Sequence, residues 1–232
     1  MPVLRCWSLS SAALVVAVLP LALNADEAGG PPPSPPPAAP PRPAGPSPWN
    51  LDLRLGFEGL PGTSKVKDDT TGVTTDVSRA GGGAVDIDLI YVRARPGGLG
   101  FAVGGGVFAH SHRADVQGLK PEIDASGIQV QGALVYRFTR GLHIEAPALV
   151  LGVGSARATK LGTVDSDRGG YASFGLQAGA YYTFRFGLQF GAVIGVMGWS
   201  STVKEQNGTG GKDDIIYSGG GGYGGLQAGF RF

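Results

Sequence analysis

Apolar and polar residues alternate one by one in eight separate stretches between residue 49 and the end of the chain. In the first stretch, 49–58, Leu51, Leu53 and Phe57 stand at odd positions, with polar or small residues between them. The other stretches are 85–91, 101–107, 128–138, 142–153, 172–184, 188–196 and 226–232. Successive side chains of a strand point to opposite faces, so each stretch predicts a strand with one apolar face. The sequence therefore predicts an all-β fold.

The connections between these stretches alternate in length. Short connections follow the second, fourth and sixth stretches, at 95–98, 139–141 and 185–187. Long polar connections follow the others, at 59–80, 111–125, 156–169 and 201–218. A water-soluble meander has no reason to place every short turn at one end, whereas a bacterial membrane barrel does. We therefore expect strands that cross a membrane.

A membrane setting fixes which face of each strand points outward. Lipid offers no hydrogen bonds, so only helices and closed barrels satisfy the backbone there. The apolar face must then contact lipid and the polar face must line the lumen. Aromatic residues of the apolar face gather toward the short turns, where an interfacial girdle is expected: Trp49, Tyr91, Phe101, Tyr136, Phe138, Tyr182, Phe184, Phe230 and Phe232.

The last stretch, with Leu226, Phe230 and the terminal Phe232, resembles the C-terminal assembly signal of bacterial outer-membrane β-barrels. Gln227 stands where that pattern usually has glycine. Residues 49–232 as a whole resemble the small eight-stranded barrels of the OmpA and OmpX type. The resemblance implies an antiparallel transmembrane barrel with short periplasmic turns and four long extracellular loops. It also implies a monomer in contact with outer-membrane lipids, lipopolysaccharide and the barrel-assembly machinery.

The residues before the barrel predict two further segments. Residues 1–25 have the features of a cleaved secretory signal: Arg5, an apolar run from Leu9 to Leu23, and a small-residue site ending at Ala25. Residues 26–48 are rich in proline, favour polyproline II and predict a periplasmic spacer. The single cysteine, Cys6, leaves with the signal.

The charge balance argues against a nucleic-acid partner. Of 19 Lys and Arg, Arg5 leaves with the signal, so 18 remain against 18 Asp and Glu. No cofactor is implied, and no His or carboxylate cluster has the spacing of a metal site.

Charged residues on the inward faces predict a network of ion pairs that fills a narrow lumen. They are Asp52, Arg54, Asp86, Asp88, Arg137, His143, Glu145 and Arg231. Pairing across the 139–141 turn would set Arg137 opposite His143, one diagonal step from Glu145. Closure of the barrel would bring Arg231 near Asp52, and we expect Arg54 to reach Asp86 or Asp88. Inward glycines in the last three stretches would instead leave space for a narrow channel.

Four functions remain open at this stage. The leading one is a non-enzymatic outer-membrane protein that serves envelope integrity or binds a surface ligand through its loops. The second is a narrow channel for ions or small solutes. The third is a lipid-modifying enzyme built on His110, Ser111, His112 and Asp115, although adjacent strand residues diverge and we assign no catalytic residue. A soluble lipocalin-like barrel would need the apolar face turned inward.

Overall fold

The computed structural model describes residues 49–115, 121–139, 141–160, 163–164, 166–206 and 210–232. The chain divides into two compact units, Met1–Pro43 and Ala44–Phe232. The predicted signal peptide and Pro-rich segment lie outside the described residues. Among those residues, no helix is long and apolar enough to cross a membrane.

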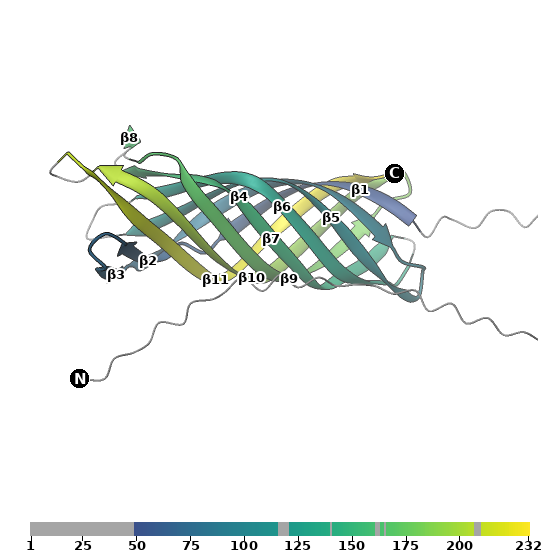
Figure 1. Ribbon diagram of the computed structural model, residues 1–232. Helices are drawn as coiled ribbons and strands as arrows, with labels where there is room; N and C mark the ends of the chain where they lie inside the picture. Colours follow the sequence, from purple (N-terminus) through teal and green to yellow (C-terminus); the bar gives the residue numbers. More distant parts are fainter. Residues whose placement is uncertain (1–48, 116–120, 140, 161–162, 165, 207–209) are drawn as a thin grey trace, which may run out of the picture. The chain divides into compact units, whose positions relative to one another are not determined.

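Eight long antiparallel strands close into a ring (Figure 1). In ring order they are β1 (Trp49–Leu60), β4 (Ser78–Arg93), β5 (Gly98–Asp115), β6 (Glu122–Arg137), β7 (Leu142–Lys160), β9 (Gly169–Thr183), β10 (Leu188–Gln206) and β11 (Lys212–Arg231). Pairing of β11 with β1, from Asp52↔Arg231 to Gly59↔Gly224, closes the ring. The prediction of an eight-stranded antiparallel barrel is confirmed.

All three short turns lie at one end of the barrel, here called the short-turn end. They are 94–97, 138–141 and 184–187, each between consecutive ring strands. Gly97 and Gly187 have φ of 73° and 95°, a left-handed conformation that favours glycine and lets the strands reverse tightly. The opposite end, here called the hairpin end, carries β2 (Thr63–Asp68), β3 (Thr74–Asp76) and β8 (Thr163–Val164).

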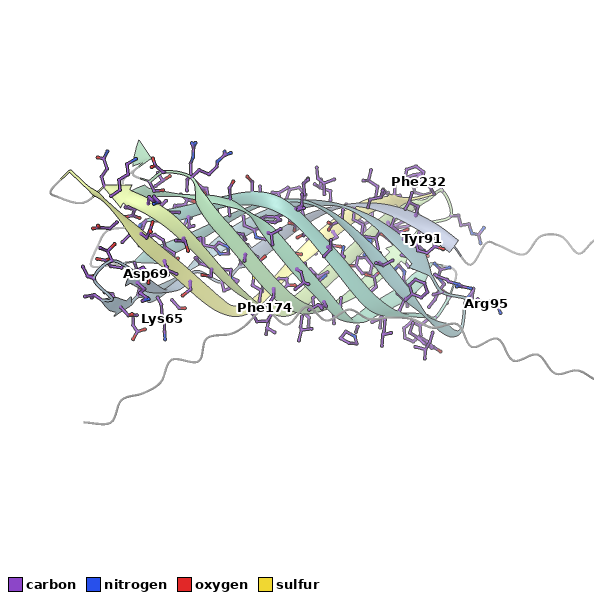
Figure 2. The ribbon with its side chains drawn as sticks, viewed as in Figure 1. Lys65, Asp69, Tyr91, Arg95, Phe174 and Phe232 are labelled. Atoms are coloured by element: carbon purple, nitrogen blue, oxygen red, sulfur yellow. The ribbon has the colours of Figure 1, made fainter. Side chains whose placement is uncertain are left out.

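The outer face of the barrel carries a broad apolar belt. Leu, Val, Ile and Phe side chains of all eight ring strands are exposed there, among them Leu53, Leu89, Val130 and Phe174. In Figure 2, Phe174 lies midway along the wall, while Tyr91 and Phe232 lie near the short-turn end. Aromatic rings meet at that end, with centroids 5.0 Å apart in Tyr182–Phe184 and 5.2 Å apart in Phe230–Phe232. A closed barrel with this outer face is a transmembrane β-barrel.

Many inward residues within the belt are polar or charged, including the buried Asp52, Arg54 and Asp88, whereas the outward residues are apolar. This arrangement is the reverse of a soluble lipocalin-like barrel, so the soluble alternative is wrong.

The expected long loops are largely strand, which corrects the sequence prediction for the hairpin end. β5 runs to Asp115, β6 begins at Glu122, and β10 and β11 stay paired from Leu188↔Phe230 to Gln206↔Lys212. The 59–80 connection contains β2 and β3, and β2 pairs with β11. The barrel therefore continues well beyond the apolar belt.

The hydrophobic alternation changes phase where the belt ends. On β6, Ile128 is 60% exposed toward the outside, whereas Ile123 is fully buried inside. On β10, Val196 points outward and Val203 inward. Beyond the belt, water replaces lipid outside, so apolar side chains gain by turning into the lumen. Polar outward residues such as Arg113 then make a strand look like a loop in the sequence.

Candidate functional site

Arg54 is the centre of a buried network in the lumen near the short-turn end. Its Nη1 and Nη2 donate to the two carboxylate oxygens of Glu145, at 2.9 and 2.6 Å. Nη2 also donates to Asp52 Oδ2 at 3.0 Å, and Nε donates to Gln189 Oε1 at 3.2 Å. The guanidinium carbon lies 4.1 Å from the ring centroid of Tyr181. Each of the three guanidinium nitrogens of Arg54 thus donates a hydrogen bond. A buried charge needs such partners to offset the loss of its hydration.

Two more predicted residues join this cluster, which we call the Arg54 network. Arg231 donates to both oxygens of Asp52, each at 2.7 Å, across the closing β1–β11 pair. His143 Nε2 lies 3.3 Å from Glu145 Oε1, and its ring stacks on Tyr181 with centroids 5.2 Å apart. Since Glu145 lies on β7, the fourth strand from β1 in either direction, the network spans the whole lumen.

One of the expected lumen contacts is wrong. Arg54 does not pair with Asp86 or Asp88; its side chain crosses the lumen to Glu145 instead. Arg137 is the cross-strand partner of His143, one diagonal step from Glu145, as expected, and Glu145 itself binds Arg54. Arg137 Nε and Nη2 are buried and have no hydrogen-bond partner among the described residues.

Asp86 and Asp88 lie closer to the hairpin end than the Arg54 network does. Together with Glu58 they line a small chamber in the lumen. Asp86 Oδ1 lies 3.3 Å from His110 Nε2, and Asp88 accepts hydrogen bonds from Gln129 Nε2 at 3.0 and 3.1 Å. The chamber has a volume of about 30 Å³. That volume holds one or two water molecules and no larger solute.

The two histidines and the serine weighed for catalysis lie on opposite sides of the wall. His110 and His112 point inward, where Tyr171 Oη lies 3.1 Å from His110 Nδ1 and 2.9 Å from His112 Nε2. Ser111 points outward and donates to Glu122 at 2.6 Å. No nucleophile and base meet here. The described residues contain no group of three or more His, Cys, Asp or Glu able to hold a metal ion.

A hydrophobic cluster fills the lumen at the hairpin end. This hairpin-end core consists of Phe108, Ile123, Ala125, Ala156, Ala158, Tyr171, Trp199, Val203 and Tyr217. The Trp199 ring stacks on His112 with centroids 4.0 Å apart, and the Tyr217 hydroxyl donates to the buried Glu205. Six of the eight ring strands contribute side chains to this core: β5, β6, β7, β9, β10 and β11.

A second apolar cluster lies in the short-turn half of the lumen, beside the Arg54 network. It consists of Ile90, Val92, Ala94, Ala102 and Val135, from β4, the following turn, β5 and β6. This apolar cluster and the Arg54 network together occupy the short-turn half of the lumen.

The inward glycines of β9 and β10 make room for aromatic rings. A Cβ at Gly191 would lie 2.2 Å from Tyr181 Cδ1, and one at Gly179 would lie 2.7 Å from Tyr181 Cε2. A Cβ at Gly195 would lie 2.8 Å from Tyr223 Cε1. The sequence analysis missed Tyr181 and Tyr223 because each interrupts a face otherwise made of small and polar residues. Glycines on the neighbouring strand at the same level were the available signal.

The hairpin end is polar outside and laced with ion pairs. Lys212 Nζ lies 2.5 Å from Asp167 and Arg113 Nε lies 3.2 Å from Glu122. The Ser111 hydroxyl and Arg113 hold the pKa of Glu122 below its usual value, and Lys212 does the same for the pKa of Asp167. These carboxylates stay charged at neutral pH. In Figure 2, Lys65 and Asp69 mark this end, opposite Arg95.

Comparisons with known proteins find similar solved structures but assign no function. No protein-family model and no curated protein matches the chain. Among solved structures, Ail, the attachment invasion locus protein of Yersinia pestis, in complex with the heparin analogue sucrose octasulfate, is 18% identical; the match covers 79% of this chain and 99% of that one, with a TM-score of 0.38. The outer membrane protein OprG of Pseudomonas aeruginosa is 11% identical, with 79% and 95% covered and a TM-score of 0.43. The outer membrane protein AlkL is 14% identical, with 84% and 95% covered and a TM-score of 0.45.

These TM-scores lie below 0.5, so the fold assignment rests on the chain's own strand pairing and outer face. The chain is a transmembrane β-barrel of eight strands, the architecture of the small outer-membrane barrels it resembles.

Proposed function

We propose that this chain is a non-enzymatic integral protein of the bacterial outer membrane that acts at the cell surface through its hairpin end. The observation that carries the proposal is the filled lumen. The Arg54 network, the chamber of about 30 Å³ and the hairpin-end core follow one another along the barrel axis. Side chains that occupy the lumen in this way favour a role for the exposed surfaces over the passage of solutes.

The expected orientation follows from the general plan of outer-membrane barrels. Short turns face the periplasm and longer connections face outside. The turns 94–97, 138–141 and 184–187 would then be periplasmic, together with the Pro-rich segment, and β2, β3 and β8 would be extracellular. The belt would contact membrane lipids and lipopolysaccharide, and the outward Leu226, Phe230 and Phe232 would be recognised by the assembly machinery. We expect a monomer.

The hairpin end suits a surface role because it is built as a polar scaffold. β2 adds to the edge of β11 and carries the exposed Lys65, while Asp69 follows it and pairs with Lys67 at 2.5 Å. Charges of both signs on a rigid sheet can support envelope integrity or the binding of a surface ligand.

Labelling of single cysteines in intact cells tests the topology. The mature chain has no cysteine once Cys6 is removed with the signal, so Asp69→Cys and Arg185→Cys each supply one thiol. We expect a membrane-impermeant maleimide to label Asp69→Cys in intact cells and Arg185→Cys only after lysis. Labelling of Arg185→Cys in intact cells, with Asp69→Cys protected, would overturn the orientation.

A complementation experiment tests the role of the hairpin end. We expect a strain that lacks this protein to become sensitive to detergents, and the intact gene to restore resistance. A variant with residues 64–76 replaced by a short glycine linker should reach the membrane and fail to restore it. Full rescue by that variant would argue against a function in this hairpin.

A further inference from the structure

A groove of about 820 Å³ lies on the outer wall where the apolar belt meets the polar hairpin end. Its floor is a row of small outward side chains on three adjacent strands: Ala109 on β5, Ser126 on β6 and Ser155 on β7. These are direct cross-strand partners, Ala109↔Ser126 and Ser126↔Ser155. Phe57 and Val85 bound the groove at one end. Small residues between rows of larger ones therefore hollow the wall.

The rows on either side of the floor differ in chemistry. Toward the short-turn end the adjoining row is apolar and exposed, with Val107↔Ile128 and Ile128↔Val153 as cross-strand pairs. On the opposite side lie Arg157 and its cross-strand neighbour Asp124, followed by Arg168. The groove thus runs from a surface that prefers hydrocarbon to a surface that prefers anions.

The two arginines are available for a ligand. Both are exposed, and neither forms an ion pair within 4.0 Å among the residues that the structure describes; the charge of Arg157 also acts on Asp167, which pairs with Lys212 at 2.5 Å. The nearby Arg113 and Lys212 are already paired, with Glu122 and Asp167. Guanidinium groups bind phosphate with paired hydrogen bonds, and such pairs are stronger than neutral ones.

We infer that this groove binds one phosphorylated glycolipid of the outer leaflet. The acyl chains lie on Val107, Ile128 and Val153, the sugar contacts the Ser126 and Ser155 hydroxyls, and a phosphate sits between Arg157 and Arg168. The amphiphile matches the order of the three rows, and the groove sits where the headgroups of a bilayer meet its hydrocarbon. The inference rests on the proposed outer-membrane location with the hairpin end outside.

Binding to the refolded mature chain in detergent tests this site directly. The probe is bis-phosphorylated lipid A, with dephosphorylated lipid A and inorganic phosphate as comparisons, and native mass spectrometry counts bound molecules. We expect the wild type to bind one lipid A, and the double variant Arg157→Gln, Arg168→Gln to bind at least about tenfold more weakly. Ser126→Leu, which fills the floor, should weaken binding similarly.

Two control variants leave the groove intact. Arg185→Gln removes an exposed arginine at the short-turn end, and Ala192→Leu enlarges an outward side chain elsewhere on the belt. Both should bind lipid A as the wild type does, and heat-dependent gel migration shows that each variant is folded.

Three results would overturn the inference. They are unchanged binding by the arginine double variant, equal binding of dephosphorylated lipid A, and competition by inorganic phosphate at the concentration at which lipid A itself binds. Binding in detergent does not depend on orientation in a cell. The lipid-binding hypothesis can therefore be refuted while the cysteine labelling confirms the orientation. Equally, the labelling can refute the orientation while the groove still binds lipid A.

Discussion

At the scale of single residues, the stability of the barrel depends on the paired, buried charges of the Arg54 network. Arg54, Glu145 and Asp52 are all nearly inaccessible to water, and each carboxylate oxygen of Glu145 accepts a hydrogen bond from Arg54. Such a group stabilises the fold only while its partner is present, because an unpaired buried charge is costly.

We therefore expect Glu145→Ala to lower the free energy of unfolding by about 3–5 kcal/mol, the cost of leaving a buried charge without its partner. Asp69→Ala removes one partner of an exposed pair with Lys67 and should cost at most about 1 kcal/mol. Urea unfolding of both variants in lipid vesicles measures the difference. Equal unfolding midpoints for the two variants would refute the network.

Gly191 tests the fit between glycine and aromatic ring inside the lumen. Since its Cβ would lie 2.2 Å from Tyr181, we expect Gly191→Ala to destabilise the barrel by roughly 1–3 kcal/mol through overpacking. Gly132→Ala, on the outer face of β6, where a Cβ would meet nothing within 4 Å, is the control for the loss of a strand glycine.

A double-mutant cycle separates the ring from other causes. In a Tyr181→Ala background, Gly191→Ala should lose most of its cost. If the cost persists there, the glycine serves the strand backbone rather than the ring.

At the scale of elements, each long strand has two environments. Within the belt its outward side chains contact lipid, and beyond the belt they contact water while the lumen becomes apolar. β6 shows both, with Val130 exposed in the belt and Asp124 exposed beyond it.

The two environments predict different tolerance to a positive charge. We expect Val130→Arg to destabilise the barrel by about 2 kcal/mol or more, because charges on the lipid face are unfavourable near the bilayer centre. Asp124→Arg, on the same face of the same strand, should change stability by about 1 kcal/mol or less. Unfolding in lipid vesicles compares the two variants. A similar loss of unfolding free energy at both positions would mean that the membrane boundary does not lie between them.

The alternation of apolar and polar residues predicted the strands well where lipid alone surrounds them. It predicted them poorly where a strand passes from lipid into water. The alternation identified eight strands and all three short turns, because lipid holds the phase constant along each belt segment. It failed at 111–125, where Ile123 and Ala125 continue the strand with the opposite phase. A change of phase, such as the one between Ala125 and Ile128, marks a membrane boundary more faithfully than a loss of hydrophobicity.

The lumen contacts were harder to predict for a geometric reason. Neighbouring strands fix the Asp52–Arg231 contact through closure of the ring, and register alone sets Arg137 opposite His143. Arg54–Glu145 joins strands on opposite sides of the ring, and no sequence pattern encodes a distance across a lumen. The groove proposed to bind a glycolipid was not predicted from the sequence for the same reason. Its floor forms only when the cross-strand register places Ala109, Ser126 and Ser155 side by side.

At the scale of the whole molecule, assembly and closure can be tested separately. The terminal Phe232 is 69% exposed on the outer face and contributes nothing to the lumen. We expect Phe232→Ala to reduce the folded fraction in the outer membrane of cells, measured by heat-dependent gel migration, while refolding in detergent stays unchanged. A defect in both settings would assign the residue to stability instead of assembly.

Closure of the lumen is the central claim, and conductance of the refolded mature chain in a planar bilayer tests it most directly. With insertion and folding verified by heat-dependent gel migration, we expect no current steps above the lipid baseline, because the Arg54 network and the hairpin-end core occupy the lumen. Discrete, reproducible steps from the same folded protein would contradict closure and make this barrel a channel.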